Sequence, residues 1–380
     1  MTTINSFVGV AGAGAMGSGI AQVALQNGHK VILYDIQQHS LDKARSTIQS
    51  GLSKWAEKAK MPEGLIEERN QNLTLSSDIR ALSSCDIIIE AVAERIEIKK
   101  DFFGAVSKIA NEECILASNT SSLSLTSIAS ACKNPGRFIG LHFFNPAPLM
   151  ALVEIIPAVQ THQQLTTQCA ELIMQWGKMP VICRDTPGFI VNRIARPFYS
   201  EALRILEENI APVESIDAAM KSIGFRMGPF ELMDLIGHDV NYAVTESVFQ
   251  SLYFDPRYRP SVTQKRLTEA GWLGKKSGRG FYRYDIEITS STDVDTSGLT
   301  HISDRIITML INEAYDALHF GVANEKDIDT AMTKGVNYPK GLIQWGREIG
   351  LLEIAARMNT LYQKYQEDRY RLSPGISSRI

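Results

Sequence analysis

The feature that most restricts the possible folds is the glycine-rich segment GAGAMG at residues 12–17. It directly follows a short apolar strand, FVGVA at 7–11, and it opens a helical pattern at about 15–28. A tight glycine turn between a strand and a helix is typical of the first βαβ unit of an open parallel sheet. We therefore expect the chain to begin with such a unit.

The glycines also point to a ligand. Gly12 permits the tight turn, Gly14 lets the backbone approach a pyrophosphate, and Gly17 allows close packing of helix on strand. Asp35 ends the second strand, where a carboxylate bonds the ribose hydroxyls of a dinucleotide. A carboxylate repels a 2′-phosphate, and IQQ rather than an arginine follows it, so NAD is predicted rather than NADP. The alternative is that the glycines only form a tight turn.

Short apolar strands alternate with helical patterns from residue 5 to about 183. Further strands are expected at 30–35, 72–77, 86–92, 114–119 and 137–143, and further helices at 95–110 and 121–132. This alternation predicts an α/β fold with a Rossmann-like, doubly wound and mostly parallel sheet. We assign residues 1–185 to this NAD-binding domain, with a charged helical insertion at about 39–70.

The rest of the chain reads as helical. A chain of 380 residues exceeds the roughly 250–300 at which single cores stop growing, so more than one domain is expected. We assign an all-α C-terminal domain to 186–285, a polar linker to 286–299 and a partial second copy of the helical domain to 300–380.

An internal repeat supports this division. The segment EALRILEENIAPVESIDAAMKSIG, which starts at Glu201, is echoed by EAYDALHFGVANEKDIDTAMTKG, which starts at Glu313. These two glutamates are 112 residues apart, as are Asp217 and Asp329. Such similarity predicts a duplicated helical module whose copies pack against each other. The alternative is a chance likeness between two amphipathic helices.

Composition excludes several classes of partner. The net charge of −3 and the isoelectric point of about 6.2 provide no basic field for nucleic acid or anionic lipid. No run approaches the ~18 apolar residues of a membrane span, and the N-terminus lacks the positive leading region of a signal peptide. The five cysteines form no CxxC, so we expect no disulfide framework, no metal site and a cytoplasmic location.

Polar clusters follow two later strands, on the carboxyl edge where open α/β sheets bind ligands. Glu90, Glu94 and Lys99 lie where the fourth strand turns into a helix. They either contact a ligand or form a solvated helix start, where acidic residues are favoured. In SNTSSLSL, Ser121 or Ser122 either caps the next helix or bonds a substrate oxygen.

The segment GLHFFNPAPLMALVEI, from residue 140, places His142 at the end of a strand on the same edge. Asn145 and Pro146 start a turn, and the next strand brings Glu154 back toward His142. An ordinary histidine pKa of about 6.5 suits proton transfer at neutral pH, and a carboxylate on its other nitrogen fixes its tautomer. From these residues alone, a structural histidine and a catalytic pair both remain open.

A series of motifs resembles the L-3-hydroxyacyl-CoA dehydrogenase family, which includes 3-hydroxybutyryl-CoA dehydrogenases. In chain order the motifs are GxGxMG, EAVxExxxxK, SNTSSL, GLHFFNP, VEI, DTPGFIVNR and MGPFELMDLIG. The resemblance covers about residues 5–284, and the tail from 300 looks like a truncated second copy of the family's C-terminal domain. It implies NAD-dependent, reversible oxidation of the 3-hydroxyl of (S)-3-hydroxyacyl-CoA in fatty or aromatic acid catabolism.

The resemblance implies a catalytic pair at His142 and Glu154. His142 would take the proton of the 3-hydroxyl while C3 passes hydride to NAD, and Glu154 would orient His142 and stabilise its cation. Ser121 and Asn192 match polar contacts that hold the hydroxyl and thioester oxygens. Because Asn192 lies at the start of the second domain, the site is expected at the interdomain cleft.

The same resemblance assigns ligand contacts along the chain. The residues that match the cofactor site are Gly12, Gly14, Met16, Gly17, Asp35, Glu94, Lys99, Asn145 and Lys275, with Lys276 as an alternative to Lys275. Coenzyme A is expected along the helical insertion, where Lys58 matches a basic contact. At the neighbouring serine contact this chain has Gly51, so one hydrogen bond to coenzyme A stays in question.

Substrate and assembly remain open at this level. The acyl group is short, as in 3-hydroxybutyryl, or dicarboxylic, as in 3-hydroxyadipyl, if an arginine such as Arg226 or Arg257 reaches its tail. The second copy lacks a counterpart of DTPGFIVNR, so we expect it to be structural. It would pack where single-copy members place a partner's domain, which makes the protein a homodimer or a monomer. Competing interpretations are a dehydrogenase of free β-hydroxy acids and a non-catalytic crystallin-like protein.

Overall fold

The computed structural model describes residues 7–60, 62–285 and 298–380. It divides into two units, Met1–Thr186 and Pro187–Ile380, which are described separately below. Most of the linker predicted at 286–299 lies outside the described residues.

The first unit is built on an eight-stranded sheet with the order β3-β2-β1-β4-β5-β6-β7-β8. The strands are β1 (Phe7–Ala11), β2 (Lys30–Tyr34), β3 (Leu73–Ser76), β4 (Ile87–Glu90), β5 (Ile115–Ser118), β6 (Phe138–Phe143), β7 (Leu152–Pro157) and β8 (Met179–Ile182). Neighbouring strands pair in parallel except for β6 and β7, which are antiparallel. The predicted Rossmann-like, mostly parallel sheet is therefore confirmed.

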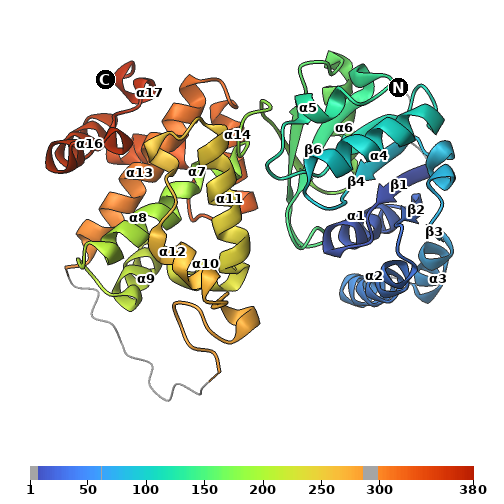
Figure 1. Cartoon of the computed structure of the whole chain (residues 1–380), viewed down its shortest axis with the longest axis horizontal. Coiled ribbons are helices and arrows are strands. Elements are labelled where there is room, and N and C mark those ends of the chain that lie inside the picture. The colour runs from blue at the N-terminus through green and yellow to red at the C-terminus, as the bar shows by residue number, and fades with distance from the viewer. Residues whose placement is uncertain (1–6, 61, 286–297) are drawn as a thin grey trace. The chain divides into compact units, whose positions relative to one another are not determined.

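Helices cover both faces of this sheet (Figure 1). Alternate strand residues such as Val8 and Val10 form one core with α1 (Ala15–Gln26), α2 (Gln38–Ala59) and α6 (Gln163–Gln175). On the other face, the ring of Phe103 in α4 (Ile96–Ile109) meets Phe138 edge-on, at 4.9 Å between centroids. That face also carries α5 (Leu125–Ala129) and a short 3₁₀ helix, η1 (Ile79–Ser84). The predicted insertion is a helical pair, α2 with α3 (Glu63–Gln71).

The helix predicted over 121–132 is much shorter than expected. Its N-cap is Ser124, whose hydroxyl accepts a hydrogen bond from the Ser127 amide at 3.2 Å. The prediction that Ser121 or Ser122 caps this helix is therefore wrong. Their hydroxyls point instead to a glutamate from the preceding loop, as described below.

The second unit is all-helical. Its helices are α7 (Val191–Ile194), α8 (Arg196–Glu207), α9 (Val213–Ser222), α10 (Pro229–Ile236), α11 (His238–Ser251), α12 (Val262–Glu269), α13 (Thr300–His319), α14 (Glu325–Gly335), α15 (Leu342–Ile349), α16 (Leu351–Tyr365) and α17 (Pro374–Ser377). The helices from α13 onward repeat the series from α7 to α12 in the same order. In this repeat, α13 corresponds to α7 and α8 together.

Matching caps show that the repeat is structural. The Asp217 carboxylate accepts hydrogen bonds from the first amides of α10, those of Phe230 and Glu231, at 2.9 and 3.0 Å. Asp329 accepts from the first amides of α15 in the same way, at 2.7 and 3.0 Å. Each aspartate therefore fixes the next helix of its own copy.

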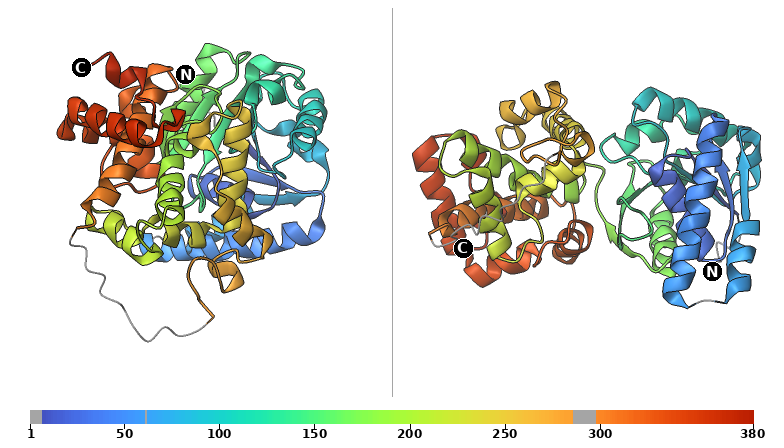
Figure 2. Two further views of the ribbon diagram at one scale, coloured as in Figure 1. Left: turned by 60° about the vertical axis from the view of Figure 1, so that its left-hand side comes forward. Right: turned by 90° about the horizontal axis from the view of Figure 1, so that it is seen from below.

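The two copies pack along α8 and α13 (Figures 1 and 2). Buried ion pairs cross this contact in both directions, from Arg193 to Glu313 at 2.8 Å and from Arg305 to Glu201 at 2.9 Å. Both arginines and both glutamates are 112 residues apart, so the contact has an approximate twofold relation.

The expectation that the second copy lacks any counterpart of DTPGFIVNR is partly wrong. HISDR at 301–305 stands where the repeat places FIVNR, with Arg305 for Arg193 and Asp304 for Asn192. The arginine is present in both copies because each one neutralises a buried glutamate of the other copy.

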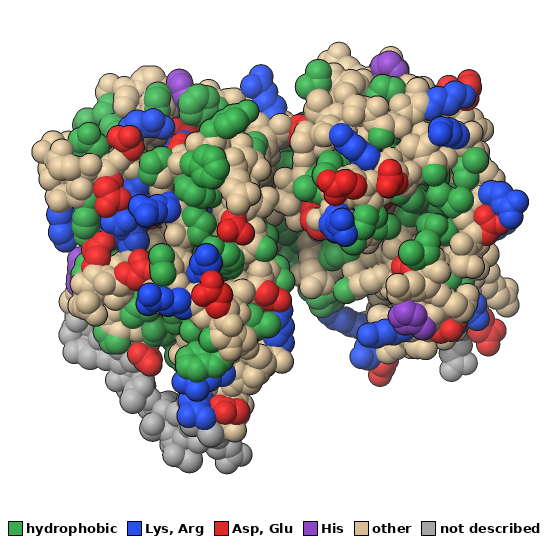
Figure 3. Space-filling view, viewed as in Figure 1, with side chains coloured by type: hydrophobic (Ala, Val, Ile, Leu, Met, Phe, Trp, Pro, Cys, Tyr) green, Lys and Arg blue, Asp and Glu red, His purple; other side chains and the backbone are tan. Residues whose placement is uncertain are grey.

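Acidic and basic side chains are intermingled on the face of each unit shown in Figure 3. Within the described residues, every helix is too short or too polar to cross a membrane.

Candidate active site

The site begins with two side chains on neighbouring strands. His142 of β6 lies directly opposite Glu154 of β7 in the antiparallel pair. The histidine Nδ1 and the Glu154 Oε2 are 2.6 Å apart, with the histidine 6% and the glutamate 0% exposed. The twelve-residue interval between them is therefore a strand, a turn and a strand, as the sequence predicts.

Hydrogen bonding assigns the roles of the two imidazole nitrogens. A carboxylate only accepts, so Nδ1 carries a proton and donates it to Glu154. Nε2, on the opposite side of the ring, is then the nitrogen whose lone pair can accept a proton. The Phe144 ring lies 4.5 Å from the imidazole, centroid to centroid, and limits how the imidazole tilts.

Glu94 gathers the serine loop that follows β5. Its Oε1 accepts hydrogen bonds from Thr120 Oγ1 at 2.6 Å, from the Ser121 amide at 2.9 Å, and from the Ser121 and Ser122 hydroxyls at 3.2 and 3.3 Å. Burial opposes ionisation, but the Lys99 ammonium and these hydrogen bonds hold the pKa of Glu94 below its ordinary value. The loop is thus arranged around a carboxylate that stays charged.

Lys99 is itself buried between two glutamates. Its Nζ lies 2.6 Å from Glu90 and 3.1 Å from Glu94, and its side chain is 1% exposed. Glu90 also accepts from the Ser118 hydroxyl at 2.6 Å, and burial raises the pKa of Glu90. The strand registers Ala11 to Glu90 and Glu90 to Ser118 place this cluster beside the glycine turn, on the carboxyl edge.

The glycine turn has the geometry that a dinucleotide requires. Gly12 has φ +101°, and a Cβ on Gly17 would lie 1.8 Å from the Gly12 carbonyl oxygen. A Cβ on Gly14 would meet no atom within 4 Å, so this backbone lies open at the start of α1. No side chain caps that helix and no acidic residue lies in its first turn, so its amides suit a phosphate.

Asp35 reaches back to this turn. Its Oδ2 accepts from the Ala13 amide at 2.8 Å, and its Oδ1 accepts from the Gln37 amide at 2.9 Å. Met16 is partly buried and packs against the core, and Asn145 is exposed in the β6–β7 loop. These residues fit the dinucleotide predicted from the sequence.

On the insertion, Lys58 is exposed in the last turn of α2. Gly51 lies in the same helix and faces Gln22 of α1. A Cβ at position 51 would be 2.2 Å from the Gln22 Oε1. Gly51 therefore accompanies a close crossing of these helices.

The remaining predicted residues lie in the second unit. Asn192 is partly exposed in α7, and Lys275 is exposed with its Nζ 5.6 Å from the Tyr284 ring centroid. The alternative, Lys276, instead forms an ion pair with Asp239 at 2.5 Å.

The two arginines considered for a dicarboxylic substrate differ sharply. Arg257 is 7% exposed and pairs with Asp316 at 2.6 Å and Asp255 at 2.8 Å. The idea that Arg257 reaches an acyl tail is therefore wrong, because its charge is already neutralised inside the helical unit. Arg226 is exposed between α9 and α10.

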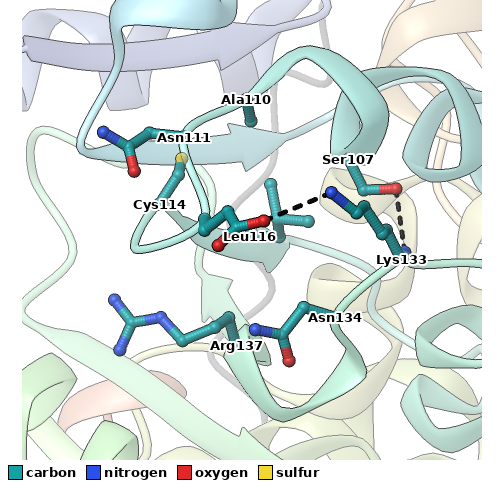
Figure 4. A pocket seen from close by; sticks show the side chains of 9 residues that line it. Ser107, Ala110, Asn111, Cys114, Leu116, Lys133, Asn134 and Arg137 are labelled. Carbon is teal, nitrogen blue, oxygen red and sulfur yellow. Dashed lines mark hydrogen bonds and ion pairs between the residues drawn. The ribbon is translucent and has the colours of Figure 1, made fainter.

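A separate pocket lies on the opposite edge of the sheet (Figure 4). It measures about 160 Å³ and lies at the amino ends of β5 and β6, lined by residues that include Cys114, Asn134 and Arg137. Lys133 spans it, with its amide bonded to the Ser107 hydroxyl and its ammonium 3.4 Å from Glu112. Ligands of open α/β sheets bind at the carboxyl ends, so this pocket is not the active site.

Sequence reasoning missed Asn119 and Lys178. The Asn119 Oδ1 accepts the amide of Phe143, next to the histidine, at 2.8 Å, and its place in SNTSS after a strand was the available signal. Lys178 bonds three carbonyls of the β6–β7 loop, and no motif marks it.

Sequence profiles match nearly the whole chain. The "3-hydroxyacyl-CoA dehydrogenase, NAD binding domain" matches residues 7–186. The "3-hydroxyacyl-CoA dehydrogenase, C-terminal domain" matches residues 188–284 and 301–379, which covers both helical copies.

Individual relatives agree. A 3-hydroxyadipyl-CoA dehydrogenase of Escherichia coli K12 is 39% identical over 96% of this chain and 95% of its own length. A probable 3-hydroxybutyryl-CoA dehydrogenase of Deinococcus radiodurans is 42% identical over 73% of this chain and 99% of its own length. The crystal structure of a 3-hydroxybutyryl-CoA dehydrogenase from Escherichia coli K12 matches with a TM-score of 0.93, at 37% identity and 98% coverage of both chains. The resemblance inferred from the motifs is confirmed, and the chain belongs to the 3-hydroxyacyl-CoA dehydrogenase family.

Proposed function

We propose that His142 and Glu154 carry out the proton transfer of this enzyme. The protein is an NAD-dependent dehydrogenase that oxidises the 3-hydroxyl of 3-hydroxyacyl-CoA to a 3-oxo group, reversibly. The observation that supports the catalytic pair is the 2.6 Å contact between the histidine Nδ1 and a fully buried carboxylate.

In this proposal, His142 Nε2 takes the proton from the 3-hydroxyl as the C3–H bond breaks. Bound at the glycine turn, NAD would supply the acceptor for the hydride that leaves C3. Glu154 keeps Nδ1 protonated, holds the ring in one orientation and stabilises the imidazolium that forms. In the reducing direction the same imidazolium returns the proton to the oxygen.

Other residues position the reactants. We assign Ser121 and Asn192 to the hydroxyl and thioester oxygens, since Ser121 lies on the carboxyl edge and both side chains are partly exposed. The cofactor contacts are the glycine turn with Met16, Asp35, Glu94, Asn145 and Lys275, whereas Lys99 is buried between Glu90 and Glu94 and so positions Glu94 instead of reaching the cofactor. Lys58 is assigned to coenzyme A, because it is exposed on the helical insertion.

The assay is the oxidation of NADH by acetoacetyl-CoA, followed by NADH absorbance. His142→Gln should lower kcat by roughly 10²–10⁴-fold, the contribution of general acid–base catalysis. NADH binding, measured by fluorescence titration, should be unchanged. Turnover near the native rate in this variant would exclude the histidine mechanism.

A dicarboxylic substrate is the second candidate. It is consistent with one relative that spans both helical copies, the 3-hydroxyadipyl-CoA dehydrogenase of Escherichia coli, whereas the solved structure that spans both copies carries the name of a 3-hydroxybutyryl-CoA dehydrogenase. Turnover across a chain-length series, with 3-hydroxyadipyl-CoA included, separates it from 3-hydroxybutyryl-CoA. If the exposed Arg226 binds the distal carboxylate, Arg226→Ala should raise KM for the dicarboxylic substrate alone.

For assembly, we propose a monomer in which the second copy replaces a partner's domain. The crossed ion pairs between the copies support this. A dimer in sedimentation at micromolar concentration would contradict the monomer.

We also propose a cytoplasmic location, supported by five buried, unbridged cysteines.

A further inference from the structure

The loop that joins β6 to β7, residues 144–151, connects the two strands of the catalytic pair and carries Asn145. Its turn is closed by the amides of Leu149 and Met150, which both donate to the Pro146 carbonyl at 3.0 Å. The loop therefore has a defined shape, but these local bonds do not attach it to the rest of the unit.

Lys178 attaches it from one side. This residue lies between α6 and β8, and its Nζ donates to the carbonyl oxygens of Ala147, Met150 and Pro148 at 2.6, 2.8 and 3.3 Å. Burial lowers the pKa of Lys178 to about 8, so the group is still mainly an ammonium at neutral pH. Hydrogen bonds from a charged donor are stronger than neutral ones, and three of them converge here.

Helix α1 holds the loop from the other side. A Cβ on Gly19 would lie 3.1 Å from the Ala147 Cβ and 3.2 Å from the Pro148 Cδ, so the loop touches this helix closely. Ala147 is 2% exposed. Because α1 begins at the glycine turn, the loop is wedged between Lys178 and the dinucleotide-binding element.

We propose that Lys178 is a positioning residue, which holds the 144–151 loop in the shape that presents Asn145 to the cofactor. This rests on the proposed contact of Asn145 with the nicotinamide half of NAD. The catalytic pair does not need Lys178, since backbone pairing between β6 and β7 sets its register. Loss of Lys178 therefore weakens use of the cofactor more than it weakens proton transfer.

The test compares Lys178→Met, which removes the donors at similar length, with Lys178→Arg, which keeps a charged donor. Lys178→Met should raise KM for NADH about tenfold, the scale expected when a preorganised loop is released, with a smaller change in kcat. KM for acetoacetyl-CoA should stay within about twofold, and Lys178→Arg should recover most of the loss. Lys133→Met, an exposed lysine at the opposite sheet edge, is the matched control and should behave as the native enzyme.

A native KM for NADH in Lys178→Met would overturn the proposal. A lower kcat that is fully explained by a smaller amount of folded protein would also overturn it. If Lys178→Met does not fold, hydrogen exchange of the native enzyme decides. The peptide that spans 144–151 should be protected by NADH, and unchanged exchange would contradict the proposal. A native enzyme that fails to turn over acetoacetyl-CoA would instead count against the proposed function.

Discussion

At the scale of single residues, Gly14 and Gly17 of the glycine turn have opposite reasons to lack a side chain. Gly17 has no room, because a Cβ would lie 1.8 Å from the Gly12 carbonyl oxygen. Gly14 has ample room, with no atom within 4 Å of a Cβ. Gly17 is therefore required by the fold, and Gly14 leaves space for a ligand.

A pair of alanine variants separates these roles. Gly17→Ala should lower the free energy of unfolding by about 1–3 kcal/mol or more, as overpacking does. Gly14→Ala should leave stability nearly unchanged, since its φ of −73° suits alanine, but it should weaken NADH binding. Thermal unfolding and NADH titration measure the two effects. Equal NADH affinity in native enzyme and Gly14→Ala would show that this backbone does not meet the cofactor.

At the scale of elements, the crossing of α1 and α2 accounts for the glycine at position 51. Gly51 of α2 lies over Gln22 of α1, and a Cβ there would be 2.2 Å from the Gln22 Oε1. A serine at this position would displace the glutamine, which is only 8% exposed. The chain thus has a close helix contact where relatives are expected to offer a hydroxyl to coenzyme A.

Gly51→Ser should cost less than about 1 kcal/mol, because the colliding atoms are the end of a flexible glutamine side chain and serine is a better helix former than glycine. Adding Gln22→Ala should restore most of that loss, because it removes the atoms that collide with the new side chain. Chemical unfolding of the two single variants and the double variant measures the coupling. Additive effects in the double variant would mean that the two residues do not compete for space.

Elements were predictable from sequence where local pattern decides them. Apolar runs bounded by turns predict β1, β2, β4, β5 and β6, and the glycine turn predicts the start of α1. The edge strand β8 is harder, since only Val181 is buried in it and Pro180 is unusual for a strand. The start of α5 is missed because the hydroxyls of Ser121 and Ser122 bond Glu94, far earlier in the chain.

In the candidate site too, features set by local sequence were predictable and features set by distant contacts were not. The pairing of His142 with Glu154 is predictable, because a strand, a short turn and a strand leave few other arrangements. The burial of Arg257 is not, since its partner Asp316 is 59 residues away in the second copy. Nor is the role of Lys178, whose three acceptors are backbone carbonyls that carry no residue-type signal.

At the scale of the whole molecule, charges buried between the two helical copies hold the second unit together. Arg193 contacts Glu313 at 2.8 Å and Asp316 at 3.0 Å, and all three side chains are almost inaccessible to water. Removing one partner leaves a buried charge without full compensation, which costs far more than the loss of a surface pair.

Arg193→Met should lower the free energy of unfolding by about 3–5 kcal/mol. The control is Lys265→Met, which removes an exposed partner of Glu269 at 3.8 Å and should cost less than about 1 kcal/mol. Urea unfolding followed by circular dichroism compares the two. A cost for Arg193→Met no larger than that of the control would mean that water already solvates this cluster.

Because the two copies lie in one polypeptide, they can have different residues at corresponding positions of their contact. In a symmetric pair of identical chains, every substitution appears on both sides of the contact at once. Here Arg204 and its counterpart Asp316 carry opposite charges, and each has found its own partner, Glu367 at 2.9 Å and Arg257 at 2.6 Å. Two fused copies can reverse a charge on one side of the contact alone, whereas a homodimer cannot. The two halves of this contact can therefore evolve separately.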